Sequence, residues 1–205
     1  MPFTTNQILA MVIGASFAAG LNVYATIATL GILAHTGYVP LPPNLHLLES
    51  WWVIGSACVM FVIEFFADKI PAFDLIWNAL HTFVRVPIAA LIGYNATAQL
   101  SPGAQMLTAA LAGTIALVAH GGKTAVRAAV TPSPEPVSNI GLSFAEDAAA
   151  IGLTWFATQH PYAAGGIALI ATVLTFFAIR WVIRATRRLW QGARREWNEL
   201  QEPAA

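Results

Sequence analysis

The segment from residue 64 to residue 85, EFFADKIPAFDLIWNALHTFVR, places five charged side chains and one histidine in an otherwise hydrophobic chain. A second segment in the second half of the chain, from residue 120 to residue 147, also contains five charged side chains and one histidine: HGGKTAVRAAVTPSPEPVSNIGLSFAED. Ten of the eleven charged residues before Arg180 lie in these two segments, and only Glu49 lies outside them. An ionisable side chain at the centre of a bilayer costs about 2.5–3.5 kcal/mol to insert. We therefore expect these groups to pair with one another or to line a wet cavity.

The rest of the chain has the composition of a membrane protein. Of its 205 residues, 57% are hydrophobic and 10% are charged, whereas soluble domains average about 25% charged residues. A helix that spans a membrane needs about 20 residues. The sequence therefore predicts an all-α polytopic membrane protein with about six hydrophobic segments. The apolar runs cover residues 8–34, 47–66, 84–97, 106–119, 137–156 and 162–183.

The two halves of the sequence follow one pattern. Each half has an apolar run, a charged segment, a break at proline and a second helix that carries polar residues. Small transporters often consist of two inverted repeats whose broken helices meet at the middle of the membrane. We therefore expect pseudo-symmetry with broken or re-entrant helices, although six complete spans fit the sequence as well.

The basic residues at the end of the chain predict its orientation. Six of the ten Lys and Arg residues lie between residues 180 and 195, directly after an apolar run. The positive-inside rule then puts the C-terminus in the cytoplasm. We expect one transmembrane domain (residues 1–188) and a basic amphipathic cytoplasmic tail (residues 189–205) that contacts anionic lipid and not nucleic acid. Cys58 is the only cysteine, so the chain has neither an intrachain disulfide nor a cysteine metal site.

An acidic pair opens the first charged segment. Glu64 and Asp68 are four residues apart and share one helix face. Two neighbouring carboxylates repel, so one of them should carry a proton, or the pair could bind a hard cation through oxygen. The alternative is a salt bridge to Lys123 or Arg127 that joins the two halves.

Further acidic and histidine side chains are candidates for proton or cation coupling. Asp74 and His81 can share a stripe with Arg85, where His81 could relay protons or serve as a hydrogen-bonded packing residue. Glu146 and Asp147 are adjacent, so they point about 100° apart and should have different partners.

A basic stripe opens the second charged segment. His120, Lys123 and Arg127 follow i, i+3, i+7 spacing on one helix face. Three potential cations together indicate a phosphate or carboxylate ligand, and the alternative is a charge zipper to the acidic pairs. Ser133 and Asn139 belong to a segment that could cap the next helix and offer its N-terminus to an anion.

Other polar residues suit structural roles. Asn22 in the first apolar run should form an interhelical hydrogen bond, and Lys69 is also assigned a structural polar role. The sequence contains no nucleotide-binding loop, HExxH motif, nucleophile elbow or haem motif, so we expect neither a cofactor nor a metal.

The combination of these motifs resembles the uncharacterised bacterial membrane family called domain-of-unknown-function family 4126, over residues 8–188. The resemblance implies a bacterial integral membrane protein, placed in the cytoplasmic (inner) membrane, and no established activity. The residues that carry it are Gly20, Leu21, Asn22, Tyr24, Glu64, Ala67, Asp68, Lys69, Pro71, Asp74, Trp77, His81, Thr82, Phe83, Arg85, His120, Gly121, Gly122, Lys123, Arg127, Ser133, Pro134, Glu135, Pro136, Ser138, Asn139, Glu146 and Asp147.

Three functional hypotheses follow from the residues. The leading one is a small transporter or lipid translocase for an anionic substrate such as a phosphorylated one, with proton coupling. Its substrate-binding residues are Arg85, His120, Lys123, Arg127, Ser133 and Asn139, and its coupling residues are Glu64, Asp68, Asp74, His81, Glu146 and Asp147.

The second hypothesis is a structural or assembly protein whose charges form only an interhelical salt-bridge network. The third is an intramembrane enzyme that acts on lipid, and it is the weakest because no nucleophile stands in a known motif. Expected partners are membrane lipids and a small anion or lipid headgroup. Small residues in the first apolar run also permit a homo-oligomer.

Overall fold

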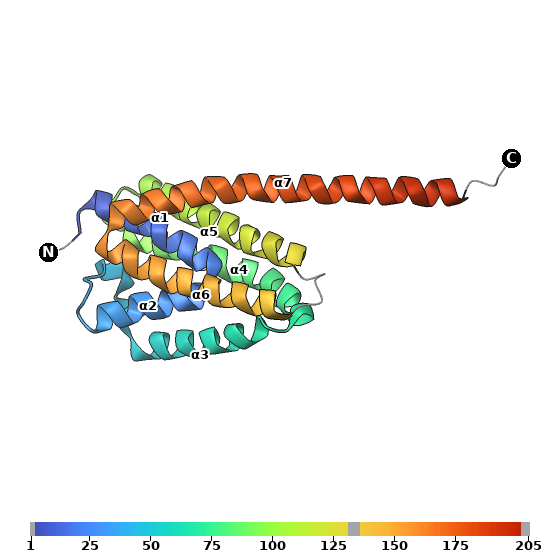
Figure 1. Ribbon diagram of the computed structural model, residues 1–205. Coiled ribbons are helices and arrows are strands. Elements are labelled where there is room, and N and C mark those ends of the chain that lie inside the picture. Colours follow the sequence, from blue (N-terminus) through green and yellow to red (C-terminus); the bar gives the residue numbers. More distant parts are fainter. Residues whose placement is uncertain (1–2, 131–135, 202–205) are drawn as a thin grey trace.

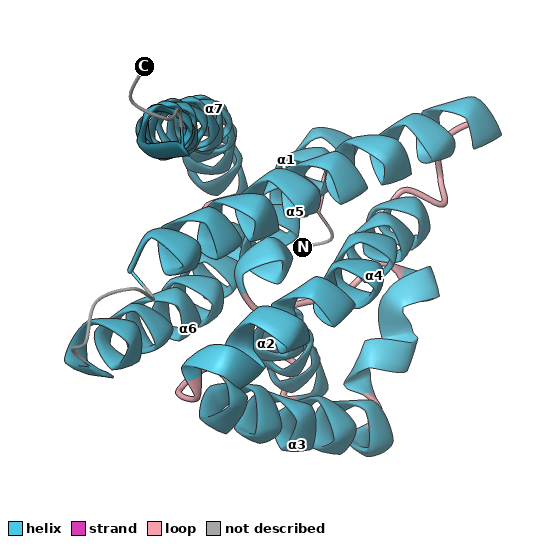
Figure 2. Cartoon of the chain, turned by 90° about the vertical axis from the view of Figure 1, so that its right-hand side faces the viewer, coloured by secondary structure: helices cyan, strands magenta, loops and turns pink. Residues whose placement is uncertain are grey.

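The computed structural model describes residues 3–130 and 136–201. Within the helices, no side chain is described at residues 71–75, 128–130, 136–139, 189, 193 and 195–201. The described chain consists of helices joined by short loops and contains no strand (Figure 2), which confirms the all-α prediction. In chain order the elements are α1 (Thr5–Leu21), α2 (Val23–His35), the 3-10 helix η1 (Pro43–Glu49), α3 (Trp51–Ala67), α4 (Pro71–Ala96), α5 (Pro102–Val130), α6 (Pro136–Gln159) and α7 (Pro161–Gln201).

Prolines set most of the helix starts. Helices α4, α5, α6 and α7 each begin at a proline, whose fixed φ and missing N–H suit the first helical position. Helix α1 begins differently, with a capping box in which the side chains of Thr4 and Gln7 satisfy backbone N–H groups reciprocally. The proline breaks seen in the sequence are therefore the joints between long helices.

Several helices are long and apolar enough to cross a membrane. By length and composition, three described segments qualify: Ile76–Ala96, Pro102–Arg127 and Pro161–Gly192. A fourth span is added if η1 and α3, which are bent by 61° relative to each other, count as one. These segments indicate a multi-pass membrane protein.

The first apolar run is not one helix, as residues 8–34 had suggested, but two. Asn22 has extended backbone angles (φ −151°, ψ 105°), ends α1 and starts α2. Its side-chain Oδ1 accepts a hydrogen bond from Ala25 N at 2.9 Å, which satisfies a free N–H group at the start of α2. Helix α2 then runs back toward the end of the bundle where α1 begins (Figure 1), so the two helices form a hairpin.

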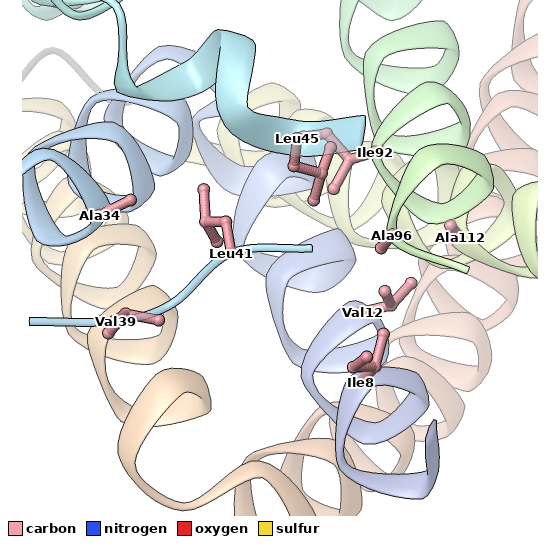
Figure 3. Packing of buried hydrophobic residues seen from close by; sticks show 9 residues of the cluster. All are labelled: Ile8, Val12, Ala34, Val39, Leu41, Leu45, Ile92, Ala96 and Ala112. Atoms are coloured by element: carbon pink, nitrogen blue, oxygen red, sulfur yellow. The ribbon is translucent and has the colours of Figure 1, made fainter. Parts of the chain in front are cut away.

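A hydrophobic cluster closes the open end of this hairpin. Side chains from the start of α1 meet side chains from the end of α2, the following loop, η1, α4 and α5 (Figure 3). The cluster consists of Ile8, Val12, Ala34, Val39, Leu41, Leu45, Ile92, Ala96 and Ala112. Apolar packing thus holds the outer end of the hairpin, while its tip at Asn22 is fully buried.

A glycine brings the tip of the hairpin against α5. A Cβ atom at Gly20 would lie 2.5 Å from the backbone oxygen of Ala116 and 2.6 Å from the Cβ of Ala119. Only a residue without a side chain allows this approach. Helix α7 starts beside the first residues of α1, runs along the bundle and continues well past the remaining helices (Figure 1), so the basic tail prolongs the last helix without a break.

Candidate functional site

The fold brings the two charged segments together around the tip of the α1–α2 hairpin. Helix α3 and its C-cap supply Glu64 and Asp68, α4 supplies Arg85, α5 supplies three residues of the basic stripe, and α6 supplies two acids. Glu146 is partly exposed, and the other members are buried. The set consists of Glu64, Asp68, Arg85, His120, Lys123, Arg127, Glu146 and Asp147, and we call it the charge network.

Arg85 connects the acidic side of the charge network to the hairpin. It donates a short hydrogen bond from Nη2 to Glu64 Oε1. Its Nη1 lies 3.3 Å from the backbone oxygen of Gly20, one of the last carbonyls of α1. These carbonyls lack helical partners and carry the negative end of the helix dipole, which suits a cation.

The same guanidinium fixes the protonation of His120. Arg85 Nη1 lies 2.6 Å from His120 Nδ1, and because a guanidinium can only donate, Nδ1 must accept. The ring proton is therefore on Nε2, which lies 2.9 Å from Thr82 Oγ1 and 3.0 Å from Asn78 O. His120 is neutral here, so the basic stripe holds two cations and not three.

Lys123 is the centre of the charge network. Its Nζ lies 2.9 Å from Asp68 Oδ2 and 3.4 Å from both Glu64 Oε1 and Glu146 Oε2. It also lies 3.4 Å from the backbone oxygen of Leu21, the last residue of α1. One buried ammonium therefore joins α1, α3, α5 and α6.

Arg127 closes the network next to Lys123. Its Nη2 lies 3.0 Å from Asp68 Oδ2 and makes a short contact with Glu146 Oε2. Its Nη1 donates to the backbone oxygen of Asp68 at 3.1 Å. The salt bridges that the sequence allowed between Asp68 and the basic stripe are thus formed.

Asp68 follows the last residue of α3, and opposing influences act on its pKa. Burial raises the pKa of this carboxyl, whereas the charges of Lys123 and Arg127 and the hydrogen bond from Lys123 lower it. The net direction is below its ordinary value of 3.8. Asp68 therefore stays ionised and holds the two cations in place.

Asp147 contacts an amide group and not a cation. Its Oδ1 accepts a hydrogen bond from Asn22 Nδ2 at 2.9 Å, and it forms no salt bridge with a described residue. His81 also lies beside the network. Its Nε2 is 3.0 Å from the hydroxyl of Tyr24, and its ring stacks on Trp77 with 4.2 Å between the ring centres.

Other residues expected in the site lie outside it or outside the described residues. Lys69 donates to the backbone oxygen of Phe65 at 2.7 Å and covers that residue's ring. Ser133 lies outside the described residues, and so do the side chains of Asp74 and Asn139. The parts that sequence reasoning missed are the backbone oxygens at the end of α1. Asn22 is a good N-cap residue, and this was the one signal that could have located the helix break.

Two hollows beside α7 reach the charge network. One has a volume of about 150 Å³ and includes Lys123 in its lining between α1, α5 and α7. The other has a volume of about 520 Å³, lies between α4, α5 and α7, and includes His120 and Arg187. Both are lined mostly by apolar side chains. Among the described residues, no group of His, Cys, Asp and Glu could hold a metal ion.

The fold and the site together define a class, a multi-pass helical membrane protein with a buried charge network at a broken helix. The chain belongs to the family described as domain of unknown function DUF4126, whose model matches residues 9–181. This match confirms the family resemblance found in the sequence. No curated protein and no solved structure matches the chain.

Proposed function

We propose that this protein is a small membrane transporter for an anion that carries a phosphate or carboxylate group, either free or as a lipid headgroup. The observation that carries this proposal is the helix break at Asn22, where Arg85 and Lys123 contact the backbone oxygens of Gly20 and Leu21. Transporters place substrate and coupling-ion sites at such breaks, because half-helix ends offer backbone groups without helical partners.

The substrate site in this proposal is the cationic centre formed by Arg85, Lys123 and Arg127. In the present arrangement Glu64, Asp68 and Glu146 occupy these cations. A substrate anion would therefore compete with a carboxylate of the protein for the same donors. Such competition gives a closed state without substrate and an open state with it, as alternating access requires.

The hollows beside α7 favour an amphiphilic substrate. Lys123 borders the smaller hollow and His120 the larger one, and most of the exposed lining area in both is apolar. A lipid could place its chain beside α7 and its anionic headgroup near the charge network. Arg187, which lines the larger hollow, adds a cation for the headgroup. This observation supports the lipid translocase form of the proposal.

The membrane arrangement belongs to the same proposal. We place α1 and α2 as a re-entrant hairpin among about six hydrophobic segments, in two halves that each contribute one charged segment. The arginines of α7 then lie on the cytoplasmic side of a bacterial inner membrane. The ends of α3 and α5 and the tail of α7 point to one side of the bundle (Figure 1), so the charge network lies toward that side.

A structural role is the second candidate, and one observation favours it. Each of the three buried cations is already paired with at least one carboxylate. A network of this kind could serve only to specify how the helices pack. Exchange of the charges in one pair, as in Asp68→Lys combined with Lys123→Asp, should then restore the function lost in each single variant.

A thermal-shift titration of the protein in nanodiscs tests the transporter proposal. Phosphate, a carboxylate and phosphatidate are added in turn, with chloride as the reference anion. A ligand that binds the native state and not the unfolded state raises the unfolding temperature, and the shift grows with the ratio of ligand concentration to Kd. We expect one of the three anions to stabilise the wild type and not Lys123→Gln, whereas Lys69→Gln, the matched control, keeps the shift. The absence of any selective shift in the wild type contradicts the proposal.

A further inference from the structure

The charges of the network do not balance. Its described members include three cations and four carboxylates, because His120 is neutral. Glu64, Asp68 and Glu146 each contact at least one cation. Asp147 is the fourth carboxylate, and it is only 5% exposed.

Asp147 has one neutral partner. Asn22 Nδ2 donates to its Oδ1 at 2.9 Å, while its Oδ2 is buried without a hydrogen-bond partner among the described residues. The orientation of the Asn22 amide is fixed, because its own Oδ1 caps α2 through Ala25 N. A single amide donor does not compensate a full buried charge, and a carboxyl group in such a place takes up a proton instead.

No described cation forms a salt bridge with Asp147, although Lys69 and Lys123 lie close enough to attract it electrostatically. From α5, Lys123 and Arg127 contact Asp68 and Glu146. After α3, Lys69 covers the Phe65 ring and donates to its backbone oxygen.

The remaining neighbours add no positive charge. Glu64 and Asp68, from α3 and its C-cap, are themselves acids. Glu146, which precedes Asp147 in the chain, pairs with Arg127. The hairpin supplies only Asn22, and the first charged residue of α7 is Arg180, which is exposed.

We propose that Asp147 is a proton-binding site, separate from the anion site, and that it holds a proton on Oδ2 in this conformation. Ser143 lies one turn earlier on the same face of α6, fully buried, and its Oγ has no hydrogen-bond partner among the described residues. A second polar group without a described partner thus accompanies Oδ2 on this face of α6.

Release of this proton would add a negative charge to the network and change which carboxylates pair with Lys123. Loss of a proton from Oδ2 to water leaves a carboxylate beside Asn22, and this carboxylate then competes with Asp68 for Lys123. Lys123 also holds the end of α1 through Leu21 O, so the proton is linked to the helix break. This role in coupling rests on the proposed function, whereas the presence of the proton does not.

Infrared spectroscopy of the full-length protein in nanodiscs tests the protonation directly. We expect a protonated-carboxyl band at neutral pH in the wild type that is absent in the nearly isosteric Asp147→Asn variant. The band should persist in Glu49→Gln, an acid outside the network, and should shift in Asn22→Leu, which removes the hydrogen bond. No such band in the wild type, or an unchanged band in Asp147→Asn, overturns the proposal.

Two further arms separate the alternatives. If the band appears in the wild type only when sodium is removed, Asp147 binds a sodium ion and not a proton, which overturns the proposal. Uptake into proteoliposomes of the anion that stabilises the wild type then tests coupling. We expect this uptake to depend on a pH gradient in the wild type and to lose that dependence in Asp147→Asn. If Asp147→Asn lacks the band but its uptake still depends on the pH gradient, Asp147 is the proton-binding site of the wild type but has no role in coupling.

Discussion

Lys123 Nζ lies 2.9 Å from Asp68 Oδ2, although the two residues are 55 positions apart in the sequence. The same ammonium contacts the last backbone oxygen of α1. The pair therefore joins the two charged segments to each other and to the broken helix. Because both side chains also contact other charged groups, this pair is the most informative place for substitutions.

Replacement of Lys123 by methionine should destabilise the protein strongly. Removal of one partner from a buried ion pair leaves an uncompensated charge and costs about 3–5 kcal/mol. Unfolding of nanodisc-embedded protein by denaturant measures this loss. Lys69→Met, which removes a lysine outside the network, should cost far less, and equal losses in the two variants would falsify the central position of Lys123.

Gly20→Ala should separate α1 from α5. The new Cβ would lie 2.5 Å from a backbone oxygen that cannot rotate away. Overpacking of this kind costs about 1–3 kcal/mol, and it should also displace the oxygen that Arg85 contacts. Gly152→Ala is the matched control, because its new Cβ meets nothing within 4 Å. A neutral Gly20→Ala variant is incompatible with the close contact described here.

Two substitutions of Asn22 separate its capping role from its contact with Asp147. Asn22→Leu loses both, and loss of an N-cap alone costs about 0.5–2 kcal/mol. Asn22→Ser keeps a capping oxygen but loses the amide donor. Hydrogen exchange at Ala25 and its neighbours should therefore accelerate in Asn22→Leu and much less in Asn22→Ser. Equal acceleration in both variants would show that the contact with Asp147, and not the cap, holds the start of α2.

The stability of the protein should fall in acid partly because of Asp68. The folded state lowers the pKa of this carboxyl, so its contribution is complete above its ordinary value of 3.8 and is lost as the pH falls through the lower folded value. Unfolding temperatures measured between neutral and acidic pH should thus drop less steeply in Asp68→Asn, which starts from a lower stability. A steeper drop in that variant contradicts the sign of the shift.

The helical class could be predicted from the sequence, and the helix bounds only in part. The apolar runs that begin at residues 106 and 162 lie inside α5 and α7, which start earlier, at Pro102 and Pro161. The break at Asn22 was not predicted, because residues 8–34 form one continuous apolar run. The partners of that break are Arg85, Lys123 and Asp147, which come from three other helices. No local pattern contains this information.

The candidate site was predictable in its members and less so in its pairing. The sequence indicated that acids near Glu64 and cations near Lys123 could meet. It did not show that Arg85, from the same segment as Glu64, lies between that acid and His120. The neutral state of His120 follows from this contact, so it depends on tertiary geometry and not on spacing.

Native mass spectrometry of gently purified protein, wild type beside Lys123→Gln with Arg127→Gln, tests the central claim most directly. We predict that the wild type retains an anionic lipid or a phosphorylated or carboxylated metabolite, and that the double variant loses it while Lys69→Gln keeps it. Lipid extraction and fragmentation then identify the chemical class of the ligand. The same lipids on all three proteins, or no selective ligand on the wild type, contradict an anion site and favour a purely structural network.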